Sequence, residues 1–230
     1  MFNQNKKQMT NTVGCLQPAY IPWIPFFKRF LTCDYFVLLD DVDFSKHKFQ
    51  NRTYIKLNNS KNLLTVPVHY KMKVPINKIK IDNTKNWKKK HYQTITQAYS
   101  KSKFFSDFQL EFEKIYQIEW DSLFKLNLEI LNFFKTYFNI QKKIYISSQL
   151  NVIGDGNEKL VNICKYFDAN YFVVKKDTES YHPKEFFQNY GIDFKYHENS
   201  SLEYNQIGNN FMPNLSILDY AANNGKKLIF

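Results

Sequence analysis

Acidic and hydroxyl side chains in this chain stand directly after apolar runs that read as buried strands. Asp40 and Asp41 follow the run YFVLL at residues 35–39, and Ser147 and Ser148 follow a second run later in the chain. Such carboxylates can act as a general base or orient a lysine, although aspartate also stabilises turns. Ligands of open α/β sheets bind at the carboxyl ends of strands, so these residues predict a site there.

Amide and cationic side chains stand close to the same predicted strands. Gln17 follows the first strand, and Gln50 and Asn51 precede Arg52, one of only two arginines in the chain. Two amides beside an arginine indicate directed hydrogen bonds to a polar ligand. Lys46 is either a solvated loop charge or a ligand for an anion.

The stretch VGCLQPAYIPWIPFFKRF at residues 13–30 raises a different question, because it either plugs a core or builds one wall of a pocket. We interpret Tyr20 and Trp23 as the wall, since flat aromatic faces suit a sugar ring or a base. Cys15 is read as a residue that packs the strand. His91, within KKKHYQ on a predicted helix, can be a surface residue, a core residue or a catalytic base.

Composition limits the classes of protein that fit this chain. Its 230 residues are 43% apolar and 23% charged, which fits one globular domain rather than a disordered chain. The net charge is +11, carried almost entirely by lysine. Such a charge suits nucleic acid, an anionic membrane or a phosphorylated ligand, but two arginines disfavour a nucleic-acid reader. A solvated lysine-rich surface is the simpler explanation.

Several classes of site are not indicated. The three cysteines lack CxxC spacing and the histidines lack partners at metal-ligand spacing, so we expect no metal and a reducing, cytoplasmic compartment. No glycine-rich dinucleotide or phosphate loop is present, and no tightly bound cofactor is expected. No apolar stretch of about 20 residues predicts a transmembrane segment.

Strand and helix patterns alternate along the chain. This alternation predicts an α/β fold, with a mixed sheet flanked by helices and a helical insertion around residues 87–137. We expect a disordered tail over residues 1–11 and a single domain over residues 12–230. Strands are predicted near residues 12–16, 35–39, 54–57, 63–68, 76–81, 144–147, 171–174 and 192–196.

The strings QPAYIPW, FVLLDDVDFSKHKFQNR and LTVPV, followed in order by ISSQL, YFVV and FMPNLSILDYAANNG, resemble the WbqC-like family over about residues 13–225. Two positions depart from the family pattern: Leu16 stands where a histidine often precedes Gln-Pro, and Phe49 stands where tryptophan often precedes Gln-Asn-Arg. The resemblance implies a bacterial protein of surface-polysaccharide or O-antigen biosynthesis. The candidate site residues that match the family motif are Gln17, Tyr20, Trp23, Asp40, Asp41, Lys46, Gln50, Asn51, Arg52, His91, Ser147 and Ser148.

The resemblance does not itself supply a reaction. Because the sequence indicates no redox motif, metal ligands or Rossmann fingerprint, we favour a transferase that moves an acyl or aminoacyl group to the amino group of a nucleotide-linked sugar. Asp41 or His91, with Asp40 nearby, would then be the catalytic base, and the partners would be a nucleotide sugar and an acyl donor or its carrier. Two alternatives remain: a sugar-nucleotide-binding accessory protein, and a hydrolase or amidase that uses Cys15 or Ser147 as nucleophile.

Overall fold

A computed structural model of the chain describes residues 10–176, 181–197 and 203–229. Residues 1–9 of the predicted tail lie outside these described residues. The helices and strands are β1 (Thr12–Leu16), α1 (Ile24–Thr32), β2 (Tyr35–Leu38), β3 (Arg52–Leu57), β4 (Ser60–Thr65), β5 (Val68–His69), η1 (Ile76–Lys78), β6 (Lys80–Ile81), α2 (Trp87–Tyr99), η2 (Phe105–Asp107), α3 (Gln109–Gln117), α4 (Leu123–Tyr137), β7 (Ile144–Ile146), η3 (Ser147–Gln149), α5 (Gly156–Tyr166), β8 (Tyr171–Lys175), α6 (Lys184–Gln188), β9 (Asp193–His197) and α7 (Ile217–Asn224).

A five-stranded parallel sheet forms the centre of the fold, in the order β7-β2-β1-β8-β9. From β1 the chain builds outward to β2 and β7 on one side, then crosses to β8 and β9 on the other. The direction of building therefore reverses beside β1, and such a switch point opens a crevice at the carboxyl ends of the strands. The α/β class is confirmed, with parallel and antiparallel strands in separate sheets.

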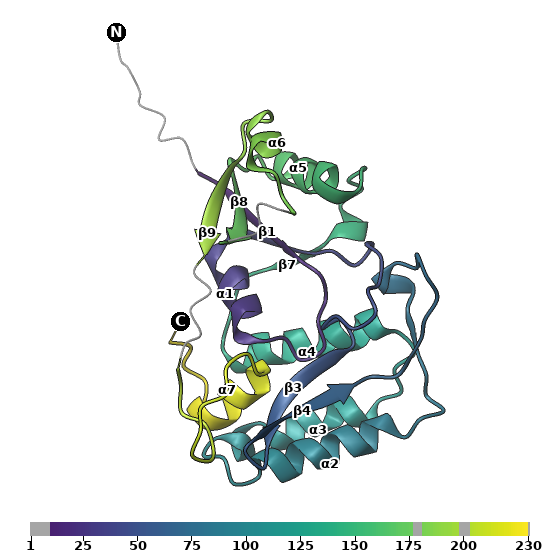
Figure 1. Cartoon of the computed structure of the whole chain (residues 1–230), viewed down its shortest axis with the longest axis vertical. Helices are drawn as coiled ribbons and strands as arrows, with labels where there is room; N and C mark the ends of the chain where they lie inside the picture. Colours follow the sequence, from purple (N-terminus) through teal and green to yellow (C-terminus); the bar gives the residue numbers. More distant parts are fainter. Residues whose placement is uncertain (1–9, 177–180, 198–202, 230) are drawn as a thin grey trace.

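Helices cover both faces of this sheet (Figure 1). Phe36 and Leu38 face the core that contains α1, whereas Val37 faces the core that contains α5 and α6. Both faces of β2 are therefore apolar, which explains its uninterrupted apolar sequence. Gly14 allows β1 to lie against the end of α1, because a Cβ at this position would stand 2.9 Å from Cys33 Sγ.

The predicted helical insertion contains α2, α3 and α4, which pack with the β3–β4 hairpin in the lower half of Figure 1. Asn58 and Asn59 form the hairpin turn with φ values of 50° and 54°, a conformation that asparagine tolerates well. The strand predicted over residues 76–81 is mostly absent. Ile76 and Ile79, three residues apart, are both buried around the 3₁₀ turn η1, so the apolar spacing reflected this turn.

Candidate functional site

Three neighbouring strands end together at the carboxyl edge of the sheet. Leu16 at the end of β1 lies opposite Leu38 of β2, and Leu38 lies opposite Ile146 of β7. The backbone continues this pairing, because Leu39 N donates to the Leu16 carbonyl. The side chains that follow these ends are therefore brought to one edge, as the strand pattern predicted.

Asp40 is the centre of a hydrogen-bonded cluster at this edge. Its Oδ1 accepts from Ser147 Oγ at 3.1 Å and from the Ser148 amide at 3.0 Å. Its Oδ2 accepts from Ser148 Oγ at 2.7 Å and from Asn77 Nδ2 at 2.9 Å. The Asp40 residue is only 1% exposed. Four donors therefore occupy its two oxygens, which is the pattern of a carboxylate that holds neighbouring segments in place.

Asp41 has a more open position beside Asp40. Its Oδ1 accepts from Ser147 Oγ at 2.5 Å, and its Oδ2 pairs with Lys159 Nζ at 2.5 Å. The Asp41 side chain is 24% exposed, whereas that of Lys159 is 9% exposed. The ion pair and the serine fix the orientation of Asp41, and solvent or a ligand can still reach its carboxylate.

Lys159 is a residue of the candidate site that the strand-end pattern of the sequence does not indicate. It lies on α5, and the next two residues, Leu160 and Val161, belong to the buried apolar side of that helix. A lysine among buried helix positions needs an anion or another hydrogen-bond acceptor. Its place on the apolar side of a helix is therefore the sequence feature that could have pointed to Lys159.

An amide pair adjoins the carboxylate cluster. Gln17, an exposed residue, accepts at Oε1 from Gln50 Nε2 at 2.7 Å. Gln50 is only 2% exposed, and its Oε1 accepts from the Ser45 amide while its carbonyl accepts from Asn127 Nδ2. Gln50 therefore positions Gln17, whose NH₂ group is the part of the side chain able to donate to a ligand.

No hydrogen bond or ion pair between described residues joins Asn51, Arg52 or Lys46 to the Asp40–Asp41 cluster. Asn51 Nδ2 donates to the Val66 carbonyl at 2.9 Å, and Asn51 is 6% exposed. Among the described residues, Asn51 Oδ1 and Arg52 Nε are buried atoms with no hydrogen-bond partner. Lys46 lies exposed in the loop before Gln50. Roles for these three residues in holding an anion stay predictions.

His91 belongs to a separate aromatic network. Its Nδ1 lies 2.9 Å from Tyr20 OH, which is also 2.8 Å from Tyr116 OH. Tyr20 is 0% exposed and His91 is 7% exposed. Burial lowers the pKa of His91 to about 4, an effect that a hydrogen bond to the Thr65 backbone partly opposes. The imidazole is therefore neutral near pH 7. Tyr20 lies behind the surface, and its role as a pocket wall stays a prediction.

Acidification is expected to destabilise the fold through His91. The folded state resists a proton that the unfolded chain accepts below its ordinary pKa of 6.5. The contribution of His91 is complete above pH 6.5 and is lost toward pH 4, a fall of about 3 kcal/mol in the free energy of unfolding. Urea denaturation from roughly pH 7 to pH 4 should show a smaller loss for His91→Gln than for the wild type. Equal losses would rule out this contribution.

The Gln-Pro to Pro-Trp segment is braced by its neighbours. Ile21 has a φ of 43°, an outlier for a β-branched residue, and its carbonyl accepts from Thr53 Oγ1 at 3.0 Å. The Trp23 ring lies 5.2 Å from the Phe49 ring. The cavity beside them, which Tyr54 also lines, measures about 10 Å³, room for one water at most. Trp23 as a wall for a sugar ring stays a prediction that requires this segment to open.

Cys15 is 4% exposed within β1. Burial, reinforced by the other two cysteines, raises the pKa of its thiol well above the ordinary value. Because the thiolate is the nucleophile, this thiol is poorly suited to attack a substrate. The packing role predicted for Cys15 agrees with its surroundings.

Larger cavities lie outside the carboxylate cluster. A groove of about 480 Å³ between α3 and α4 has Phe108, Phe133 and Tyr137 in its lining, and no predicted site residue lines it. The largest of these cavities therefore lies away from the residues able to do chemistry, and we assign the candidate site by the chemistry of its side chains.

Across the described ranges, no three His, Cys, Asp or Glu side chains are grouped to hold a metal ion. Nor does any helix in the described part of the chain have the length and apolar character needed to cross a bilayer.

Comparisons with known proteins match the same family that the order of the sequence motifs resembles. The model of the WbqC-like protein family matches residues 17–229. The chain is also 28% identical over 217 residues to a Mycobacterium tuberculosis protein named uncharacterized protein Rv1507c, covering 93% of this chain and 94% of that protein. No solved structure gave a significant match. The family match covers most of the sequence, and the chain therefore belongs to the WbqC-like protein family.

Proposed function

We propose that this protein is an enzyme of bacterial surface-glycan or modified-sugar biosynthesis, such as O-antigen assembly. It transfers an acyl or aminoacyl group from an activated donor to the amino group of a nucleotide-linked amino sugar. The observation that carries the proposal is the Asp41 carboxylate, which is oriented by Lys159 and Ser147 and remains partly exposed at the carboxyl edge of the sheet.

Asp41 is the general base in this mechanism. The amine attacks the acyl carbon of a thioester or ester, a C–N bond forms, and the bond to the donor's leaving atom breaks with its electron pair. The amine proton passes to an Asp41 oxygen, and the leaving group takes up a proton on release. Asp41 is favoured over His91 because His91 is buried with Tyr20 and Tyr116.

The neighbouring side chains have supporting roles in this mechanism. The Gln17 amide, held by Gln50, would donate to the oxyanion that develops on the acyl carbonyl. Lys46 or Arg52 would hold a phosphate of the nucleotide sugar. Asp40 would keep Ser147 in contact with Asp41 rather than exchange protons itself.

The hydrolase alternative fits the geometry less well. Cys15 is buried with a raised pKa, and Ser147, which is 1% exposed, shares its one hydroxyl proton between two carboxylates instead of donating it to a histidine. The accessory-protein alternative uses the same residues for binding alone. Substitution of Asp41 distinguishes catalysis from binding alone, because binding of the nucleotide sugar does not require a proton acceptor.

Thermal-shift screening with nucleotide amino sugars and acyl thioesters tests the proposal. A ligand present at about 100 times its Kd would raise the free energy of unfolding by about 2.7 kcal/mol. That is roughly 5–10 °C in Tm for a chain of this size. We expect a shift with a nucleotide amino sugar and a smaller shift when its amino group is replaced by hydroxyl. The proposal fails if neither ligand class changes Tm.

A further inference from the structure

Two adjacent loops form a basic surface that is connected to the candidate site through Ser45 and Gln50. We define the basic loop pair as residues 45–49 and residues 70–74, with sequences SKHKF and YKMKV. Four lysines and one histidine occupy these ten positions, and the nearest acidic residue in the sequence is the exposed Asp43, two positions before the first loop. The basic side chains, all exposed, are Lys46, His47, Lys48, Lys71 and Lys73.

Contacts made by the residues that flank the two loops hold the loops side by side. Phe44 N donates to the Val74 carbonyl at 2.9 Å, and the Phe44 ring lies 5.5 Å from the Tyr70 ring. An isolated β-bridge also pairs Asp43 with Pro75. Each loop is turned sharply, with φ values of 70° at His47 and 55° at Lys73. The lysines of both loops therefore belong to one patch rather than to two separate tips.

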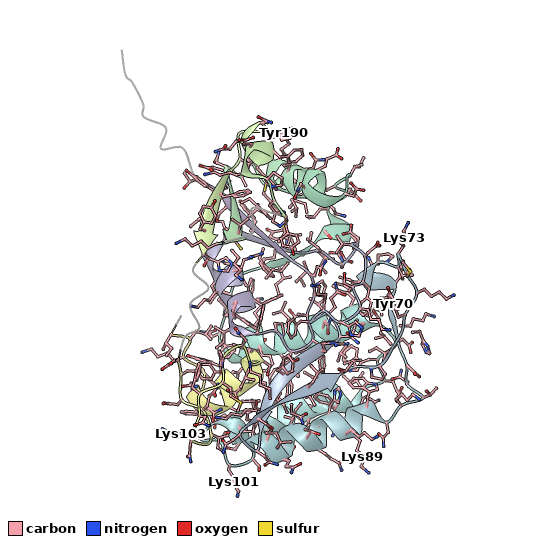
Figure 2. All side chains as sticks on the ribbon, viewed as in Figure 1. Tyr70, Lys73, Lys89, Lys101, Lys103 and Tyr190 are labelled. Atoms are coloured by element: carbon pink, nitrogen blue, oxygen red, sulfur yellow. The ribbon has the colours of Figure 1, made fainter. Side chains whose placement is uncertain are left out.

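Apolar side chains stand among these charges. Met72 is 77% exposed, and Tyr70 and Phe49 are each 38% exposed. A single exposed apolar residue is ordinary, but here three lie within a patch that carries four lysines. Figure 2 shows Tyr70 and Lys73 on one side of the molecule, with Lys73 directed outward.

We propose that the basic loop pair docks the protein on an anionic lipid surface. Lysine is attracted to acidic headgroups by about 1 kcal/mol for each side chain near the membrane. Met72 and Tyr70 would add apolar contact below the headgroups, and stable attachment to a membrane generally requires two such signals. The inference is independent of the acyl-transfer proposal, because it concerns adsorption and not turnover.

A lipid surface fits the patch better than nucleic acid does. Nucleic-acid readers use arginine for bidentate contacts, and neither Arg29 nor Arg52 belongs to these loops. A phosphate backbone also offers no partner for the thioether of Met72. Acidic lipids supply both the charge for the lysines and an apolar layer for this side chain.

Docking at this patch would bring the candidate site close to the membrane. Ser45 N donates to Gln50 Oε1 at 2.8 Å, and Gln50 in turn holds Gln17. The basic loop pair is thus attached directly to the amide pair beside the Asp40–Asp41 cluster.

Vesicle co-sedimentation of the full chain tests the inference. We compare vesicles of phosphatidylcholine alone with vesicles that also contain phosphatidylglycerol. The wild type should sediment only with the anionic vesicles, and added salt should release it. Lys71→Gln/Lys73→Gln should weaken binding about 25-fold, a factor of about five for each lysine. Met72→Ser should also weaken binding, although it leaves the charge unchanged.

Lys101→Gln/Lys103→Gln is the matched control. It removes the same charge from the far end of the molecule, where Figure 2 shows both lysines well away from Lys73. This variant should bind within about twofold of the wild type, because exposed charges beyond a Debye length contribute little. All the substituted side chains are exposed, so the variants should share the wild-type Tm.

Four results would overturn the inference. They are equal binding to both vesicle types, wild-type binding by Lys71→Gln/Lys73→Gln, an equal loss in the Lys101→Gln/Lys103→Gln control, and salt-dependent binding to oligonucleotides without binding to vesicles. The third result would indicate diffuse attraction by net charge, and the fourth would identify nucleic acid as the partner.

Discussion

Asp40→Ala is expected to lower the free energy of unfolding by about 2–5 kcal/mol. Of the four donors to Asp40, Ser147 Oγ keeps its bond to Asp41, and Ser148 Oγ belongs to an exposed residue and can reach water. The Ser148 amide and Asn77 Nδ2, whose hydrogen bonds to Asp40 are partly buried, lose their acceptor, and a donor left unsatisfied away from water costs about 1–3 kcal/mol. Urea denaturation measures the loss.

Asp43→Ala is the control for this prediction. Asp43 is an exposed aspartate three positions along the same segment, so its removal should change stability by no more than about 0.5 kcal/mol. Similar losses in the two variants would mean that Asp40 does not hold the strand ends together. The difference between the variants therefore isolates the hydrogen-bonded cluster from the general effect of removing a negative charge.

The strand-end part of the candidate site was predictable because parallel strands place their carboxyl ends at one edge. Asp40 and Ser147 each follow an apolar run, and they meet across 107 positions of sequence as that rule requires. The strand-end rule explains only one partner of the hydrogen bond between Gln17 and Gln50. Gln17 follows a strand of the central sheet, whereas Gln50 belongs to a loop. The local sequence pattern predicted that these residues lie at the same edge of the sheet, but it did not specify which of their atoms form hydrogen bonds.

Contacts made by helices were not predictable in the same way. His91 was grouped with Asp41 as a candidate base, whereas the structure buries it with Tyr20, 71 positions away. The face that α2 presents to the core depends on the packing of α3 and α4, which a single sequence does not specify. Lys159 was missed for the same reason, because its partner Asp41 is 118 positions away.

The fold itself followed from sequence where elements were long or apolar on both faces. The helical insertion predicted around residues 87–137 begins with α2 at Trp87 and ends with α4 at Tyr137, and β1 spans the predicted residues 12–16. Prediction failed at η1, where isoleucines at alternating and three-residue spacings fit both a strand and a 3₁₀ turn. Short segments with few apolar residues take their structure from the neighbours they pack against.

Asp41→Asn is expected to lower turnover by about 10²–10⁴-fold while leaving substrate affinity nearly unchanged. Asparagine has almost the shape of aspartate and can still accept from Ser147 Oγ, but it cannot take the proton of the attacking amine. His91→Ala should reduce turnover much less, because its imidazole lies in the aromatic network with Tyr20. The acyl-transfer assay uses the donor and nucleotide sugar that raise Tm, and full turnover by both variants would exclude the acid–base mechanism.

A second variant separates lost chemistry from lost structure. Asp41→Asn leaves the Lys159 ammonium, which is 9% exposed at its side chain, without its carboxylate, and this unpaired charge should itself destabilise the fold. Asp41→Asn/Lys159→Met removes that charge while keeping an unbranched side chain of similar length, so Tm should recover toward the wild type. Turnover should not recover with it, because the proton acceptor is still missing. Recovery of both quantities together would mean that Asp41 supports the fold and that the base lies elsewhere.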